Sequence, residues 1–104
     1  MSVDILAIGL DADLVEAQIA RVRALGYYVE ICRVDTGETA EEVTRLHLES
    51  RTFDCVLFGA GLCAPAHRML FEKLLNLVHA RAPLAKICFN SSPADSAEAV
   101  QRWV

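Results

Sequence analysis

The stretch VLFGAGLCAPAHR, residues 56–68, decides the fold because it predicts a buried strand, a glycine loop and the first turn of a helix. The strand part is wholly apolar, as in a central strand of a parallel sheet. Gly59 and Gly61 then open a loop whose backbone N–H groups can face a ligand above the strand end. Pro65 is a favoured residue in the first helical turn. The segment therefore predicts one strand–helix unit with a loop at the carboxyl end of the strand.

The chain contains four such units. The expected strands cover residues 3–9, 27–34, 54–58 and 84–89, and the expected helices cover residues 12–25, 39–50, 65–81 and 93–103. Strict alternation of strands and helices predicts a parallel sheet with right-handed crossovers and helices on both faces. Glu30 and Arg33 indicate that the second strand is an edge. The sequence thus predicts one four-stranded α/β domain over residues 1–104, with the flavodoxin-like strand order 2-1-3-4.

Composition and charge exclude several classes of function. A hydrophobic fraction of 54% over 104 residues, with a mean hydropathy of +0.31, predicts a substantial core and an apolar face for a partner. A net charge of -4 with scattered Lys and Arg excludes a nucleic-acid partner. No apolar run approaches the ~20 residues that span a bilayer, and residues 1–4 lack the features of a signal peptide. We expect a cytoplasmic protein with reduced cysteines and no membrane partner.

The polar residues at the ends of the third and fourth strands form the candidate ligand site. In a sheet of this order, ligands bind beyond the strand carboxyl ends, between the first and third strands. The expected ligand-binding residues are Gly59, Ala60, Gly61, Cys63, His67, Arg68, Asn90 and Ser91. A small anion held by backbone N–H groups is the ligand that this loop favours. The competing interpretation is that the glycines only permit a tight turn.

Cys63 and His67 are candidates for catalytic roles. Cys63 precedes a helix start, where the helix dipole lowers the pKa of a thiol. Four residues separate Cys63 from Arg68, whereas cysteine phosphatases place five there, so the spacing is closer to that of rhodaneses. Pro65 removes one N–H group from the loop. His67 could act as a base or a ligand contact, or could be a half-buried histidine bonded to a loop carbonyl.

Two acids after the first strand, Asp11 and Asp13, are interpreted as helix caps. Receiver domains bind magnesium with paired acids at this place, but they also need an aspartate at the end of the third strand, where this chain has Gly59. Two acids would also repel the phosphate of a flavin. Ser92 and Asp95 have the spacing of N-cap and N3 in the last helix. We therefore expect no metal and no cofactor.

Six segments of the second half carry a resemblance. They are Gly59-Ala60-Gly61, Leu70-Phe71-Glu72-Lys73, Asn76, His79-Ala80-Arg81-Ala82-Pro83, Ile87-Cys88-Phe89-Asn90 and Ser92-Pro93-Ala94-Asp95. With these residues the chain resembles a group of short bacterial α/β proteins of flavodoxin-like, receiver-like topology without an assigned activity. The resemblance implies the fold and no catalytic roles. A basic residue often stands in that group where this chain has Cys63, which favours an anion-facing loop.

Several functions remain open after these observations. The first is a module that binds a small molecule or anion through the loop after the third strand. The alternative is a noncatalytic interaction or regulatory protein acting as a homo-oligomer, and the second alternative is a thiol-dependent enzyme using Cys63. Because no fifth strand covers the fourth, and because the third helix and Trp103 are apolar, we expect a homodimer through the third or fourth helix.

Overall fold

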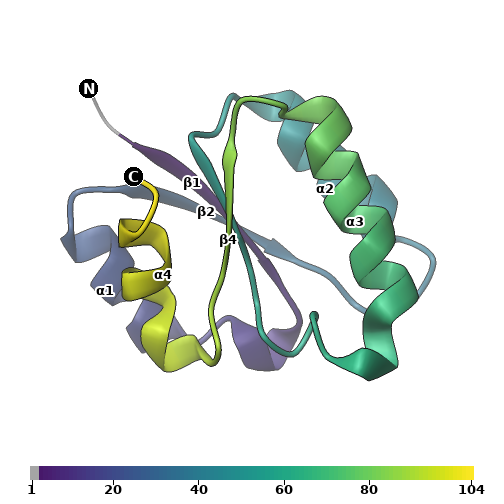
Figure 1. The fold of residues 1–104 in the computed structure, drawn as a ribbon, viewed down its shortest axis with the longest axis horizontal. Coiled ribbons are helices and arrows are strands. Elements are labelled where there is room, and N and C mark those ends of the chain that lie inside the picture. Colours follow the sequence, from purple (N-terminus) through teal and green to yellow (C-terminus); the bar gives the residue numbers. More distant parts are fainter. Residues whose placement is uncertain (1–2) are drawn as a thin grey trace.

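The computed structural model describes residues 3–104, and it confirms the parallel α/β fold and the strand order (Figure 1). The strands are β1 (Asp4–Gly9), β2 (Tyr28–Arg33), β3 (Cys55–Phe58) and β4 (Lys86–Phe89). They form one four-stranded sheet in the order β2-β1-β3-β4, and every neighbouring pair is parallel. Met1 and Ser2, which belong to the segment expected to lack a signal peptide, lie outside the described residues.

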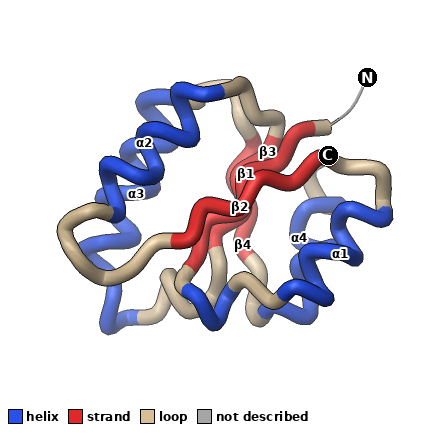
Figure 2. The backbone as a smooth tube through the Cα atoms, turned by 180° about the vertical axis from the view of Figure 1, so that it is seen from behind, coloured by secondary structure: helices blue, strands red, loops and turns tan. Residues whose placement is uncertain are grey.

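Two helices cover each face of the sheet (Figure 2). Helices α1 (Glu16–Ala24) and α4 (Ser96–Gln101) lie on one face, and α2 (Ala40–Ser50) and α3 (Arg68–Arg81) lie on the other. Side chains alternate along β1, so Ile5 packs toward α1 and α4 whereas Leu6 packs toward α2 and α3. This alternation of apolar residues gives the sheet two cores. Within residues 3–104, no helix has the length and apolar content to cross a bilayer.

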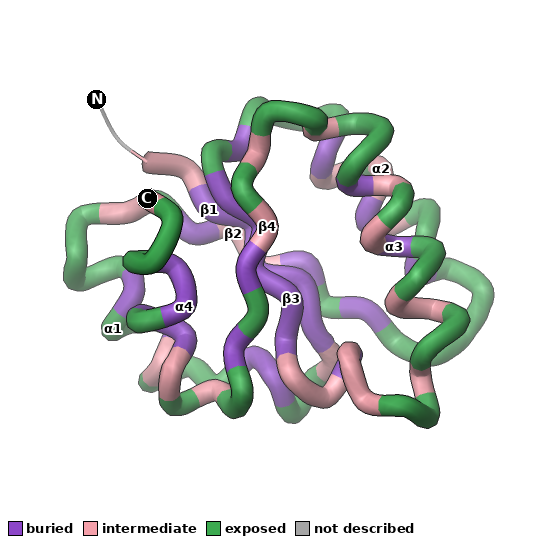
Figure 3. Tube along the Cα trace, viewed as in Figure 1, coloured by how far each residue is buried: buried purple, intermediate pink, exposed green. Residues whose placement is uncertain are grey.

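Burial separates the central strands from the edge strands (Figure 3). Every residue of β3 is buried, whereas β4 has exposed residues at both ends. Phe58 of β3 is fully buried and packs its ring against Phe71 of α3 and Phe89 of β4, with ring centroids 5.3 and 6.0 Å away. Phe89 itself is 43% exposed. The aromatic cluster therefore joins the core to the open edge of the sheet.

Three helices begin with a separate turn that the sequence pattern did not predict. Short 3-10 turns at Asp11–Asp13, Pro65–His67 and Pro93–Asp95 precede α1, α3 and α4. The prediction that Asp11 and Asp13 cap the first helix is wrong for α1, whose N-cap is Val15, but Asp13 does cap the preceding 3-10 turn by accepting a hydrogen bond from Leu10 N–H. The Asp13 side chain also turns inward, toward the loop after β3. In contrast, Ser92 and Asp95 form the predicted cap, here on the 3-10 turn before α4.

Candidate functional site

The side chain of Asp13 closes the crevice between the loops that follow β1 and β3. Its Oδ1 atom accepts a hydrogen bond from Gly61 N–H at 2.6 Å, and its Oδ2 atom accepts from Leu62 N–H at 3.1 Å and from Leu10 N–H at 2.9 Å. Asp13 is only 7% exposed. A buried carboxylate needs such donors, because water no longer solvates its charge. The backbone donors expected to hold an external anion are thus bonded to a carboxylate of the chain itself.

Three glycines make room for this carboxylate. A Cβ atom added to Gly59 would lie 2.5 Å from the Cβ and Cγ atoms of Asp13. Added Cβ atoms on Gly9 and Gly61 would lie 2.7 Å from Asp13 atoms. Among residues 3–104, only Gly26 has a positive φ, so backbone conformation does not explain the other glycines. The loop does form a turn, with Cys63 N–H donating to Gly59 O, but its backbone does not require glycine; the glycines instead leave room for Asp13.

Asn90 joins the loop after β3 to the loop after β4. Its Oδ1 atom accepts a hydrogen bond from Ala60 N–H at 2.8 Å, and its Nδ2 atom donates to Ser96 Oγ at 3.0 Å. The backbone N–H and the hydroxyl of Ser91 both donate to the Asp95 carboxylate. Asn90 thus bonds to Ala60 and Gly61 bonds to Asp13, so these polar groups are satisfied within the chain.

Cys63 is a protonated thiol at neutral pH. Burial raises its pKa to about 11, and the negative charge of Asp13 adds to this effect. The expectation that the helix start lowers the pKa of Cys63 is wrong, because the nearby carboxylate and the loss of water dominate. This thiol consequently lacks the ionised form that a nucleophilic cysteine needs.

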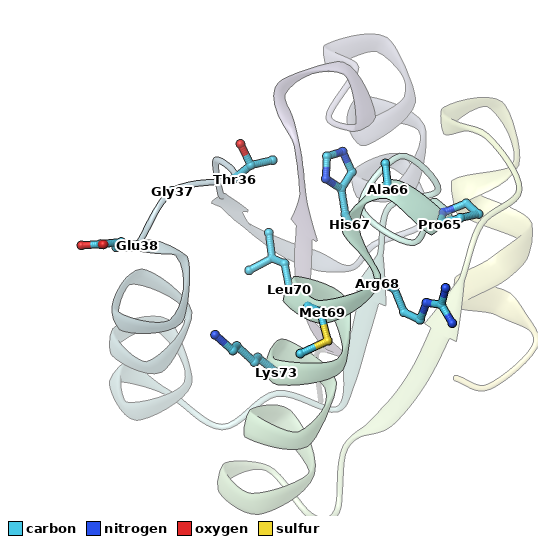
Figure 4. A pocket seen from close by; sticks show the side chains of 10 residues that line it. All are labelled: Thr36, Gly37, Glu38, Pro65, Ala66, His67, Arg68, Met69, Leu70 and Lys73. Atoms are coloured by element: carbon cyan, nitrogen blue, oxygen red, sulfur yellow. The ribbon is translucent and has the colours of Figure 1, made fainter.

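A cleft of about 590 Å³ lies beside this loop, between the β2–α2 connection and the start of α3. Its lining residues, drawn in Figure 4, are Thr36, Gly37, Glu38, Pro65, Ala66, His67, Arg68, Met69, Leu70 and Lys73. Figure 4 shows Lys73 on the same side of α3 as Glu38, whereas Arg68 extends in the opposite direction. The cleft therefore places His67 and Lys73 near the β2–α2 connection and Arg68 at the far rim.

Two basic residues and one acid line the cleft. Arg68 and Lys73 are accompanied by one acid, Glu38, although the whole chain has a net charge of -4. The ion pairs within residues 3–104 use other cations, so Arg68 and Lys73 have no carboxylate partner there. Met69 and Leu70 supply apolar surface beside these charges. The arrangement can hold an anionic group next to an apolar one.

A histidine–carboxylate pair lies elsewhere, between β2 and α2. The Nδ1 atom of His47 is 2.5 Å from Oε2 of Glu30, and the Tyr28 hydroxyl donates to Oε1 of Glu30 at 3.2 Å. Such a pair resembles the base and orienting acid of many hydrolases. However, the nearby Ser50 hydroxyl donates to the His47 backbone carbonyl at 2.8 Å. Among residues 3–104, no hydroxyl or thiol is hydrogen-bonded to this imidazole.

Sequence reasoning missed Lys73 and the residues of the β2–α2 connection. Thr36 and Glu38 are separated from Lys73 by α2, β3 and the 3-10 turn before α3, and only the fold brings them together. The two glycines after β3 and the acids after β1 were a usable signal for Asp13, because the carboxyl ends of these adjacent strands meet. Within residues 3–104, no three metal-binding side chains gather in a possible ion site.

Comparison of the chain with protein-family models, with curated proteins and with solved structures found no match.

Proposed function

We propose that this protein is a binding module for a small anionic molecule, which it holds in the cleft beside the start of α3. The observation that carries the proposal is Lys73, which has no carboxylate partner within residues 3–104 and lines a cleft of about 590 Å³ that has Arg68 at its rim. Cavities that take metabolites and other small ligands are commonly of this size. The predicted residues His67 and Arg68 belong to this cleft, so the proposal keeps part of the expected site.

Side chains, rather than backbone donors, would bind the anion. Asp13 and Asn90 accept the hydrogen bonds of Ala60, Gly61 and Leu62 N–H, which removes these donors from the reach of a ligand. Lys73 supplies a charged donor, and the His67 imidazole supplies a second polar contact. Leu70 lies between these two residues in the sequence and offers apolar contact. A small carboxylate with an apolar portion, or a phosphate ester, matches this combination of groups.

Titration with defined anions tests the proposal. Sodium benzoate, sodium citrate and inorganic phosphate are added at constant ionic strength, and backbone amide shifts and thermal stability are recorded. We expect saturable shifts over residues 65–73 with at least one of these anions. At a ligand concentration 100 times the Kd, binding adds about 2.7 kcal/mol to the free energy of unfolding.

Matched variants separate specific binding from general charge effects. Lys73→Ala and His67→Ala should weaken binding, whereas Lys86→Ala removes the same charge from exposed β4, outside the cleft. If no anion gives a saturable shift, or if Lys73→Ala and Lys86→Ala bind the anion equally well, the proposal is rejected.

A noncatalytic interaction protein that forms homo-oligomers is the second candidate. The internal bonding of the loop donors supports it, since the loop after β3 then serves the fold. A protein that ignores every anion but changes mass with concentration would fit this candidate. For either function we propose a cytoplasmic location, where cysteines such as Cys55 and Cys88 stay reduced.

A further inference from the structure

We propose that two copies of this chain associate through β4 in an antiparallel, two-fold pair centred on Ile87. β4 is an edge strand, bonded on one side to β3 only. In Figures 1 and 3 it runs between the two helix pairs, and no helix crosses its open side. An uncovered edge presents backbone N–H and C=O groups that can pair with another strand.

The inner and outer backbone groups of β4 can be assigned from its hydrogen bonds. Lys86 N–H donates to Asp54 O at 2.9 Å, so Lys86 faces β3. Because a parallel strand turns alternate residues toward each side, Cys88 also faces β3, and Ala85, Ile87 and Phe89 face outward. The Phe89 carbonyl confirms this direction, since it accepts a hydrogen bond from Arg102 Nη2 at 2.9 Å.

The outward groups suit a second copy in one register. When Ile87 lies opposite Ile87 of the second copy, the two residues exchange two N–H···O bonds across the two-fold axis. Phe89 then lies opposite Ala85 of the second copy. Phe89 N–H can donate to that Ala85 carbonyl, and the two-fold axis repeats this bond.

The remaining two outward groups are already bonded in each chain. The Phe89 carbonyl accepts from Arg102, and Ala85 N–H donates to Ala82 O at 3.1 Å. In the register centred on Ile87, these two groups would face each other, so the pairing leaves no donor or acceptor without a partner. The Phe89 carbonyl already accepts one hydrogen bond from Arg102, so it does not need the N–H group that an unrelated strand would place opposite it. This self-matching favours a second copy as the occupant.

The side chains agree with the same register. The side chains of Ala85, Ile87 and Phe89 lie on the sheet face that α2 and α3 cover. In the proposed pair, Ile87 contacts Ile87 of the second copy, and Phe89 contacts Ala85 of the second copy. Phe89 is 43% exposed in the single chain, and the pairing would cover part of its ring. On the other face, Lys86 lies opposite Cys88 of the second copy, so the two lysines do not oppose each other directly. The pair therefore buries apolar side chains on one face and avoids placing two lysines opposite each other on the other face.

Amide hydrogen exchange of the whole chain tests the pairing at low and high protein concentration. Ile87 N–H faces solvent in a single chain and is bonded in the pair. We expect its exchange to slow as the concentration rises, together with a shift from monomer to dimer in sedimentation equilibrium. Amides bonded within the β1–β3 pair should not change between the two concentrations.

Variants then locate the interface. Ile87→Pro removes the outward N–H without removing any bond to β3, because edge strands tolerate proline at such positions. Loss of the two central bonds should weaken dimerisation about tenfold or more. Phe89→Lys, which keeps the backbone groups, should also weaken it, and Met69→Lys at an exposed position of α3 serves as the control.

A chain that remains monomeric to high micromolar concentration overturns the proposal. It is also overturned by a dimer whose association constant is the same in Ile87→Pro, Phe89→Lys and the unmodified chain. If Ile87→Pro fails to fold, Phe89→Lys and the exchange of Ile87 N–H still decide the question. None of these measurements depends on the anion cleft.

Discussion

Gly59 and Asp13 lie so close together that a single added carbon at Gly59 would come within 2.5 Å of the Asp13 side chain. The loops after β1 and β3 therefore contact each other where the Asp13 side chain packs against the α-carbon of Gly59. Backbone N–H groups from both loops complete the contact. The acid and its glycines act as one unit that fixes the carboxyl ends of the two central strands.

Replacing Asp13 by alanine should strongly destabilise the fold. The change leaves the N–H groups of Leu10, Gly61 and Leu62 without their shared acceptor in a buried place. Because hydrogen bonds to a charged group contribute more than neutral ones, we expect the free energy of unfolding to fall by at least about 3 kcal/mol. Urea denaturation measures it.

Asp11→Ala is the matched control for this change. Asp11 pairs with Arg33 at 2.7 Å, but its side chain is 89% exposed. An exposed ion pair contributes little, so the free energy of unfolding should change by less than about 1 kcal/mol. If Asp13→Ala and Asp11→Ala lower the free energy of unfolding equally, the buried hydrogen bonds of Asp13 contribute no more to stability than an exposed ion pair.

Gly59→Ala should be destabilising mainly because of Asp13. When Asp13 is present, the new methyl group lies 2.5 Å from Asp13 Cβ and Cγ, so the backbone or the Asp13 side chain must shift. In an Asp13→Gly background the obstruction is gone, so the same substitution should cost less. A double-mutant cycle measures this coupling, for which we expect a magnitude above about 1 kcal/mol.

Gly37→Ala controls for the general effect of adding a methyl group to a loop glycine. Its new Cβ meets only Asp35, at 3.1 Å from Oδ1, in an exposed turn. The change in the free energy of unfolding caused by Gly37→Ala should be the same with Asp13 and with Asp13→Gly. Additive effects of Gly59→Ala and Asp13→Gly would show that the two residues do not constrain each other.

The Cys63 thiol should react slowly with alkylating reagents at neutral pH. Burial, followed by the charge of Asp13, raises its pKa to about 11, and only the thiolate is a strong nucleophile. The rate of iodoacetamide labelling, followed by mass spectrometry of the Cys63 peptide, should rise with a midpoint near pH 11. A midpoint at or below the ordinary cysteine value of about 8.5 would restore the hypothesis of a reactive thiol.

Asp95 should stabilise the fold except in acid. Hydrogen bonds from the Ser91 hydroxyl, and then from backbone N–H groups of Ser91 and Ser92, lower the pKa of Asp95. Its stabilising effect is therefore present above the unfolded-state pKa and is lost as the pH falls through the lower folded-state pKa. Asp95→Ala should cost about 1 kcal/mol near pH 7, as for other helix caps.

Urea unfolding as a function of pH checks this dependence. The difference between Asp95→Ala and the unmodified chain should shrink in strong acid, where the carboxyl is protonated in both states. Ser91→Ala removes the largest cause of the lowered pKa while keeping the carboxyl group, so it should move the pH dependence upward. If the difference in free energy of unfolding between Asp95→Ala and the unmodified chain stays constant down to strong acid, the ionised Asp95 carboxylate does not stabilise the fold.

The sequence predicted the strand order because the information was local or periodic. The apolar runs of β1 and β3 and the charges of β2 distinguished central from edge strands, and the Ser92–Asp95 spacing located a cap. Asp13 was misjudged because its local spacing also suits a helix cap, whereas its partner Gly61 lies 48 positions away. Asp13 keeps a local capping bond to Leu10 N–H and adds tertiary bonds to Gly61 and Leu62 that have no local signal in the sequence.

The cleft could not be predicted from the sequence, because its lining residues also come from segments far apart in the chain. Its charged residues come from the β2–α2 connection and from α3, which no short motif links. Arg68 was predicted from its position in the loop, but its direction away from the β2–α2 connection depends on the 3-10 turn that precedes α3 (Figure 4). A turn of this kind changes where each following side chain points.

Because Asp13 already accepts the hydrogen bonds of the loop N–H groups, a dissolved anion has to compete with Asp13 for these donors. A carboxylate attached to the chain has an effective concentration beside its donors that dissolved metabolites do not approach in a cell. A free phosphate or carboxylate would first have to displace it and would leave its charge buried without partners. Fluctuating anion levels should therefore leave the ends of β1 and β3 unaffected.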